Sequence, residues 1–150
     1  MYGNWENQSK NIVPFFTATY SEKEKITLEL QKLQNPIQFI FVGTFTKGKN
    51  VAYAIQLVEK LNENGVDSEL NIFGSGAELD TISNQIANSN YKLKLHLKGN
   101  CNREEMKLQY QKSNFLILAS KSEGWPKVVA EAMFWGCLPI VTPVSCVTDM

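Results

Sequence analysis

The sequence predicts an α/β fold that is built around a doubly wound parallel sheet. From residue 37 onward, five short apolar runs alternate with four stretches of helical periodicity. Each run spans four to seven residues, which is the usual length of a strand in a sheet. Strands that alternate with helices pair in parallel through right-handed crossovers, so helices are expected to cover both faces of this sheet.

Glycines and helical periodicity define the elements in the first half of this region. The predicted elements are strand 37–42, helix 50–64, strand 70–73 and helix 77–87. Gly43 closes the first strand, and Gly74 begins the Gly-Ser-Gly turn that ends the second. Between these strands, apolar residues recur at the 3.6-residue spacing of a helix until Gly65 stops it.

The second half continues the same alternation. The predicted elements are strand 92–98, helix 103–112, strand 115–119, helix 126–135 and strand 138–141. In the first of these, leucines alternate with polar residues, which predicts a strand with one wetter face. Ligands of such a sheet bind beyond the carboxyl ends of its strands. Function is therefore expected in the loops that follow the strands, at residues 43–50, 74–77, 99–103, 119–126 and 142–149.

Residues 1–36 lack the regular alternation of strand and helix patterns that follows, and they are expected to form an interdomain segment. Their first twenty residues are polar and aromatic without a clear period. Ser21 and Glu24 form a capping box, which predicts a short helix through Leu33 that Pro36 ends. Residues 37–150 are then interpreted as a single domain, which is expected to be truncated at its carboxyl-terminal end.

Composition and charge exclude several classes of protein. The chain has 150 residues, of which 43% are hydrophobic, and this suits one globular domain. Fifteen basic residues balance fifteen acidic ones and Arg103 is the only arginine, so a nucleic-acid partner is not expected. Cys101, Cys137 and Cys146 lack a metal-binding spacing. With no signal peptide and no long apolar run, the sequence predicts a cytoplasmic protein.

The loop at residues 120–126 carries the strongest signal for a binding site. It runs directly into a predicted helix with Pro126 near the first position, where proline is favoured. Gly124 lets a ligand approach the backbone, and the first turn of a helix can hold an anion. Glu131 is the only charged residue in the apolar stretch that follows. Such a carboxylate must reach water at an edge, find a partner or bind a ligand.

Glu123 and Glu131 are separated by seven residues in the frame Ser-Glu-Gly-x-Pro-x-Val-x-x-Glu-Ala-Met-x-x-Gly-x-Pro-Ile-Val. This stretch resembles the donor-binding signature of retaining glycosyltransferases of the GT-B fold, especially family 4. The spacing of the two glutamates alone is a weak signal, but the surrounding glycines, prolines and Ala-Met pair make it a strong one. The resemblance implies that the predicted sheet is the Rossmann-like half of a GT-B fold.

The resemblance covers about residues 37–142 and includes the first predicted loop. In the family, Gly-Arg ends the first strand and Lys-Gly follows five residues later. Here Gly43 and Lys49 match, but Thr44 stands where the arginine is usual, so one guanidinium of the phosphate clamp is lost. Lys47 either compensates for this loss or is a solvated loop lysine, and the sequence leaves both interpretations open.

The resemblance also implies roles for the matched residues. Glu131 would hydrogen-bond the ribose hydroxyls of a nucleotide sugar, because a carboxylate accepts from two vicinal hydroxyls at once. Glu123 and Lys49 would be the catalytic residues, with the carboxylate facing the sugar ring and the ammonium on the diphosphate. The backbone amides of Gly124 and Trp125 would lie near the sugar or phosphate. The remaining expected donor-binding residues are Lys47, Gly43, Thr44, Gly74 and Asn100, the last at the strand exit that faces the nucleobase in the family.

The implied activity is retaining transfer of a hexosyl group to a saccharide or glycolipid acceptor, in surface polysaccharide biosynthesis. The donor substrate would be a nucleotide-diphosphate sugar, with no further cofactor, and the sequence has no Asp-x-Asp motif to hold a metal. In the family an amino-terminal domain binds the acceptor. We expect that this chain does not include that domain and that the fragment alone is inactive. The full enzyme is expected in the cytoplasm, with peripheral association at the inner face of the plasma membrane.

Two other functions are weighed against this one. Thr44 and the missing acceptor domain favour a non-catalytic nucleotide-sugar-binding module, or a subunit that needs a partner chain. A nicotinamide-binding Rossmann domain is disfavoured, because the turn that begins at Gly74 lacks the third glycine of that motif. His96 is the only histidine, and it is interpreted as a residue of the wetter strand face rather than a base.

Overall fold

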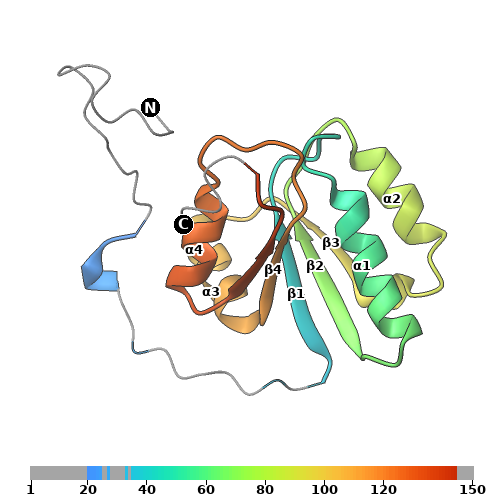
Figure 1. Ribbon diagram of the computed structural model, residues 1–150, viewed down its shortest axis with the longest axis horizontal. Coiled ribbons are helices and arrows are strands. Elements are labelled where there is room, and N and C mark those ends of the chain that lie inside the picture. Colours follow the sequence, from blue (N-terminus) through green and yellow to red (C-terminus); the bar gives the residue numbers. More distant parts are fainter. Residues whose placement is uncertain (1–19, 25–26, 28–32, 34, 145–150) are drawn as a thin grey trace.

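Strands and helices alternate along the chain, as the sequence predicts. The computed structural model describes residues 20–24, 27, 33 and 35–144 (Figure 1). From residue 37 onward, the strands and α-helices are β1 (Ile37–Val42), α1 (Val51–Glu63), β2 (Ser68–Phe73), α2 (Leu79–Ala87), β3 (Leu95–Gly99), α3 (Arg103–Lys112), β4 (Phe115–Leu118), α4 (Lys127–Phe134) and β5 (Leu138–Val141). All four strand pairings are parallel, which confirms the predicted doubly wound α/β fold.

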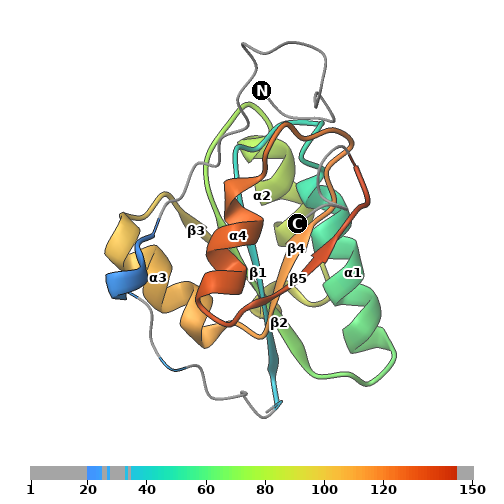
Figure 2. The same ribbon diagram turned by 60° about the vertical axis from the view of Figure 1, so that its left-hand side comes forward.

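The order of the strands decides where a ligand can bind. The sheet runs β3-β2-β1-β4-β5, so the chain winds outward from β1 in one direction and returns to start again at β4. Helices α1 and α2 cover one face of the sheet, and α3 and α4 cover the other (Figures 1 and 2). The reversal between β1 and β4 is a topological switch point, where the loops diverge and leave a crevice at the carboxyl ends of the strands.

Side chains of β1 alternate between the two faces of the sheet and contribute to a hydrophobic cluster on each face. Phe39 and Phe41 point to one face and join the core cluster under α1 and α2. Ile40 points to the other face and packs in a second cluster with Tyr110 of α3 and with Trp135. Because β1 is buried on both faces, it reads as an almost continuous apolar run.

Two strands, β2 and β3, differ from their predicted bounds by more than one residue. Residues 92–94 form a short 3-10 helix, and only then does β3 begin at Leu95. Leu93 is 83% exposed and precedes the strand. The predicted alternation of buried leucines therefore wrongly includes Leu93. Strand β2 begins two residues before its predicted start because Ser68 and Glu69 pair with Ile37 and Gln38 of β1. Ser68 is buried, and its carbonyl accepts a hydrogen bond of 2.9 Å from Asn62 Nδ2.

The prediction of a helix at residues 21–33 is wrong where the structure describes this segment. A 3-10 helix spans Glu22–Glu24, while Thr27 and Leu33 belong to no helix. The capping-box contact itself forms, since the Ser21 backbone N–H donates to Glu24 Oε2 at 2.9 Å. The rest of that prediction lies outside the described residues, as does most of the predicted interdomain segment.

The start of the described chain packs against the α3–α4 face (Figure 2). The ring of Tyr20 stacks on Phe134 with centroids 5.3 Å apart and meets Trp135 edge-on at 4.9 Å. Arg103 at the start of α3 lies over the Tyr20 ring and pairs with Glu24, with Nη2 2.8 Å from Oε1. These contacts attach the chain that precedes β1 to the layer that carries Glu131.

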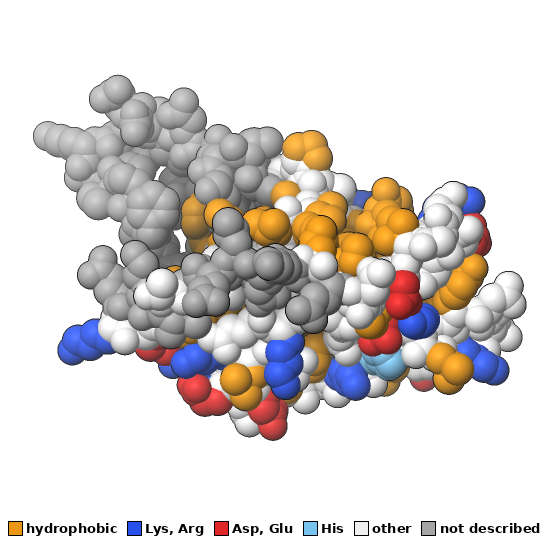
Figure 3. Space-filling model, turned by 90° about the horizontal axis from the view of Figure 1, so that it is seen from below, with side chains coloured by type: hydrophobic (Ala, Val, Ile, Leu, Met, Phe, Trp, Pro, Cys, Tyr) orange, Lys and Arg blue, Asp and Glu red, His pale blue; other side chains and the backbone are white. Residues whose placement is uncertain are grey.

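Part of the surface of the molecule is apolar. Figure 3 shows hydrophobic side chains gathered together on the face seen from below, with charged side chains along one side. On β5, the edge strand that pairs with β4, Leu138 and Ile140 are 62% and 43% exposed. Among the described residues, no helix combines the length and the apolar character that a membrane span requires.

Gly74 provides a test of how the strand ends are held together. Its φ is +137°, and a Cβ at this position would lie 1.9 Å from the carbonyl oxygen of Gly43. We expect Gly74→Ala to lower the free energy of unfolding by about 3 kcal/mol or more, from backbone strain and the clash together. Gly65 is the control, because its φ is +79° but a Cβ there meets no atom within 4 Å. Gly65→Ala should cost about 1 kcal/mol. Urea unfolding measures both, and equal losses would contradict this explanation.

Candidate functional site

The switch point brings together the loops that follow β1 and β4. The backbone N–H of Lys121 donates to the carbonyl of Gly48 at 2.8 Å and ties the two loops to each other. From the next strand along the sheet, Thr142 Oγ1 donates to the carbonyl of Ser120 at 2.6 Å. The predicted loops 43–50 and 119–126 are therefore neighbours in space.

An ion pair joins the two predicted catalytic residues across these loops. Lys49 Nζ lies 2.6 Å from Oε1 and 2.8 Å from Oε2 of Glu123, so both carboxylate oxygens accept from one ammonium. The Glu123 side chain is only 6% exposed and that of Lys49 is 29% exposed. The residues are 74 positions apart in the sequence, and the fold places them in direct contact.

The turn that places Lys49 depends on the next residue. Asn50 has φ 53° and ψ 48°, the left-handed conformation, and α1 begins immediately after it. Asparagine tolerates this conformation better than most residues that carry a side chain.

The first turn of α4 faces the same pair of loops. Helix α4 begins at Lys127, directly after Pro126, and has neither a side-chain cap nor an acidic residue in its first turn. Gly124 is exposed, and a Cβ built there would meet no atom within 4 Å. Trp125 is half-buried and follows it in the loop. The amino-terminal end of a helix favours an anion because its N–H groups and dipole point outward.

Glu131 lies one turn further along α4 and is half-buried. Its Oε2 accepts a hydrogen bond of 3.3 Å from the hydroxyl of Tyr110 on α3. Burial and the nearby negative charge of Glu131 raise the pKa of Tyr110 far above its ordinary value, so this phenol stays protonated. The carboxylate therefore has a partner on α3 in place of the outward, solvated position that was one of its predicted alternatives.

Sequence reasoning missed Tyr110. It belongs to a helix that is strongly polar, and only the few large side chains of that helix signal its buried face. Tyr110 itself is 0% exposed. Tyr110 and Glu131 are 21 positions apart in the sequence and lie on different helices. The periodicity of α3 alone cannot predict a contact with α4.

A hollow of about 290 Å³ lies at the carboxyl ends of β1, β2 and β3. Four residues predicted to bind the donor share its lining, namely Gly43, Thr44, Gly74 and Asn100. Met106 of α3 also lines it. Asn100 Nδ2 donates to Ser75 Oγ at 3.2 Å on the same rim. The fold thus gathers four predicted residues from three separate loops into one wall.

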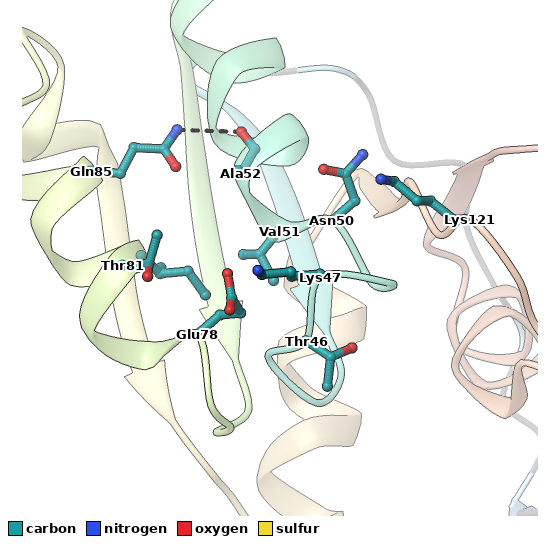
Figure 4. A pocket seen from close by; sticks show the side chains of 10 residues that line it. Thr46, Lys47, Asn50, Val51, Ala52, Glu78, Thr81, Gln85 and Lys121 are labelled. Atoms are coloured by element: carbon teal, nitrogen blue, oxygen red, sulfur yellow. Dashed lines mark hydrogen bonds between the residues drawn. The ribbon is translucent and has the colours of Figure 1, made fainter.

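Lys47 lies in a different hollow. This second hollow, of about 250 Å³, is bounded by the loop after β1 and the first turns of α1 and α2 (Figure 4). Lys47, Glu78 and Lys121 are its charged lining residues, and neither Lys49 nor Glu123 belongs to the lining. Whether Lys47 also assists the phosphate clamp stays a prediction.

The other candidate groups of the sequence lie away from the switch point. His96 is on β3, with Nε2 3.4 Å from Glu69 Oε2 on the neighbouring strand. Cys137 is fully buried, and burial raises the pKa of its thiol to about 12, so it stays neutral. Within the part of the chain that the structure describes, no three His, Cys, Asp or Glu residues gather as metal ligands would.

Comparison with known proteins identifies the family. The family described as "Glycosyl transferases group 1" matches residues 22–150. The chain belongs to this family. The match includes all nine strands and α-helices between β1 and β5 together with the loops of the candidate site.

A curated relative of the chain is a glucosyltransferase by name. The chain is 25% identical over 128 residues to poly(glycerol-phosphate) α-glucosyltransferase of Bacillus subtilis (strain 168), which covers 85% of the chain. The matched part of the chain spans only 19% of that relative's length, about a fifth.

Solved structures agree on the fold. The pneumococcal O-GlcNAc transferase GtfA, in complex with UDP and GlcNAc, matches 73% of the chain with a TM-score of 0.67 and 25% identity. The chain covers 21% of GtfA. The lipopolysaccharide outer core galactosyltransferase WaaB matches 80% of the chain with a TM-score of 0.70 and 21% identity, and the chain covers 34% of it.

The Lys49–Glu123 pair makes a prediction about stability. Lys49→Met leaves a nearly buried carboxylate without its cation, so we expect the free energy of unfolding to fall by about 1–3 kcal/mol. The loss stays below that of a fully buried pair because Lys49 is partly exposed. Lys60→Met is the matched control, because Lys60 pairs with Glu63 on the exposed face of α1. It should cost less than about 0.5 kcal/mol. Equal losses in urea unfolding would contradict the structural importance of the buried pair.

Proposed function

We propose that this chain is the donor-binding domain of a retaining glycosyltransferase that transfers a hexosyl group from a nucleotide-diphosphate sugar to a saccharide or glycolipid acceptor. The observation that carries the proposal is the buried Lys49–Glu123 pair at the switch point, next to the first turn of α4. The donor would lie along α4, with its sugar at Glu123, its diphosphate at Lys49 and its ribose at Glu131. Membership of the glycosyl transferases group 1 family supports this assignment.

The charges at the site suit glycosyl transfer. As the bond between the anomeric carbon and the diphosphate oxygen breaks, positive charge develops on the carbon and negative charge on the leaving oxygen. An ammonium and a helix amino terminus aimed at that oxygen stabilise the transition state electrostatically. In this proposal, Lys49 and the first turn of α4 supply these groups, and the Glu123 carboxylate faces the sugar once the donor is bound.

The ion pair keeps both groups in place before the donor binds. Glu123 holds the Lys49 ammonium with two short contacts of 2.6 and 2.8 Å, so the lysine needs little reorganisation to meet a diphosphate. Binding would replace part of this contact by contacts to phosphate oxygens. The same step frees one carboxylate oxygen of Glu123 toward the sugar.

The hollow at the ends of β1, β2 and β3 is the proposed place of the nucleobase. It adjoins α3, whose Tyr110 holds Glu131, and it contains Asn100 at the exit of β3. Metal-independent transfer is part of the proposal and is supported by the absence of an Asp-x-Asp motif from the sequence. The names of a poly(glycerol-phosphate) α-glucosyltransferase and a lipopolysaccharide outer core galactosyltransferase among the similar proteins support an acceptor in a surface polysaccharide. UDP is the first nucleotide to test, because one similar structure was solved with it.

A second candidate is a non-catalytic nucleotide-sugar-binding module that works with a partner chain. The specific observation in its favour is Thr44, which lines the nucleobase hollow where the family usually has arginine. A threonine hydroxyl cannot replace the bidentate, charged contact of a guanidinium with a phosphate. The two proposals share the binding step and differ in turnover.

Donor binding is tested by thermal unfolding of the chain with UDP-glucose, UDP-GlcNAc, GDP-mannose and ADP-glucose. At 100 times its dissociation constant, a ligand adds about 2.7 kcal/mol, which for this chain length is a rise in melting temperature of about 5–10 °C. NAD is the control for the alternative Rossmann function and should leave the melting temperature unchanged. The proposal would be overturned if the melting temperature rose with NAD alone, or if it rose with no sugar nucleotide.

The role of Glu123 is tested in a protein that carries this domain together with an acceptor-binding half. Glu123→Gln keeps the size of the side chain and removes its charge. We expect turnover to fall about 100-fold or more while nucleotide affinity changes little, since the carboxylate acts on the developing charge. A wild-type protein that binds donor without any turnover would establish the non-catalytic module instead. Residues 1–150 alone should show no transfer.

A further inference from the structure

Tyr110 is a buried polar side chain to which the proposed mechanism gives no task. It lies on α3, is 0% exposed and packs in the core cluster with Ala132 and Trp135. Its hydroxyl donates to Glu131 Oε2 at 3.3 Å. A buried hydroxyl needs a hydrogen-bond partner, and here the partner is the carboxylate that stands alone in the apolar part of α4.

The contact engages one carboxylate oxygen of Glu131 and leaves the other available. Among the described residues, Glu131 makes no ion pair and no second side-chain hydrogen bond. A carboxylate oxygen has two lone-pair sites, so Oε2 also retains capacity to accept. The Tyr110 hydroxyl stays protonated and can only donate to this carboxylate. The phenol therefore fixes the rotation of the carboxylate without consuming its binding capacity.

The position of Tyr110 relates this carboxylate to the nucleobase hollow. Met106 lies four residues before Tyr110 on α3, and it lines the hollow at the ends of β1, β2 and β3. Residues four apart lie on the same side of a helix, about 6 Å apart along its axis. Helices α3 and α4 lie side by side on one face of the sheet (Figures 1 and 2). The partner of Glu131 thus lies about one helical turn along α3 from a residue that lines the hollow.

We propose that Tyr110 is a positioning residue that orients Glu131 toward the vicinal hydroxyls of a ribose and so makes the site selective for ribonucleotides over 2′-deoxyribonucleotides. The inference rests on the proposed function, since it assumes that a nucleotide lies along α4. A carboxylate that is held in one orientation meets both hydroxyls without losing rotational freedom on binding. Removing the phenol hydroxyl leaves the charge in place but releases its orientation.

The experiment measures how strongly the chain prefers ribose. Isothermal titration compares UDP, GDP and ADP, each with its 2′-deoxy counterpart, for the wild type and for Tyr110→Phe. The wild type should bind its best ribonucleotide about tenfold more tightly than the deoxy form, and Tyr110→Phe should reduce this ratio to about threefold or less. Tyr53→Phe is the control, because Tyr53 is 51% exposed on α1, on the opposite face of the sheet. It should keep the wild-type ratio.

A second variant separates orientation from simple loss of packing. Glu131→Gln should lower the same ratio, and adding Tyr110→Phe to it should lower the ratio no further if the two side chains act as one unit. A lower melting temperature alone does not change the ratio between two ligands. If the wild type binds a nucleotide and Tyr110→Phe keeps its ribose preference, this inference is wrong and the proposed function stands. If the wild type binds no nucleotide, both are wrong.

Discussion

The buried contact between Lys49 and Glu123 is the interaction on which the rest of the site depends. It joins the loop after β1 to the loop after β4, which the sheet order makes neighbours. A pair so little exposed is stable only with good geometry, because both charges lose most of their hydration. Every other element of the candidate site is placed relative to these two loops. The hollow lies on one side of the β1 loop, and α4 starts directly after the β4 loop.

The backbone around the pair supports its position. Gly43 donates its N–H to the Phe73 carbonyl, and Gly74 donates to the Gly99 carbonyl, so the ends of β1, β2 and β3 are held in one layer. The close approach of Gly74 to Gly43 leaves no room for a side chain. On the other face, the packing of Tyr110 against α4 fixes the second carboxylate. A site for an extended ligand needs both the joined strand ends and the packing against α4, because Glu123 lies in the loop before α4 and Glu131 lies within the helix.

The fold was predictable because its signals are local. Continuous apolar runs and helical periodicity place β1, α1, α3 and β5 almost at their observed bounds. The prediction fails where tertiary contacts decide. Leu93 has the pattern of a strand residue but is exposed, and Ser68 belongs to β2 because it pairs with Ile37 of β1. At the amino-terminal side, Ser21 and Glu24 make their capping contact without a longer helix at Thr27 or Leu33.

The candidate site was predictable in its membership but not in its pairings. The motif around Glu123 and the loop around Lys49 indicated both residues, and the sheet order explains why they meet. Nothing in the sequence assigns Tyr110 to Glu131, since a side-chain contact between two helices depends on their relative placement. For the same reason the sequence could not tell that Lys47, two residues before Lys49, lines a separate hollow.

The most direct test of this account is a crystal structure of the chain with the nucleoside diphosphate that it binds most tightly. The account predicts a ribose within hydrogen-bonding distance of Glu131, a diphosphate between Lys49 and the first turn of α4, and the base in the hollow beside Asn100. A nucleotide seated instead in the hollow that Lys47 lines, with Glu131 still bonded only to Tyr110, would contradict it.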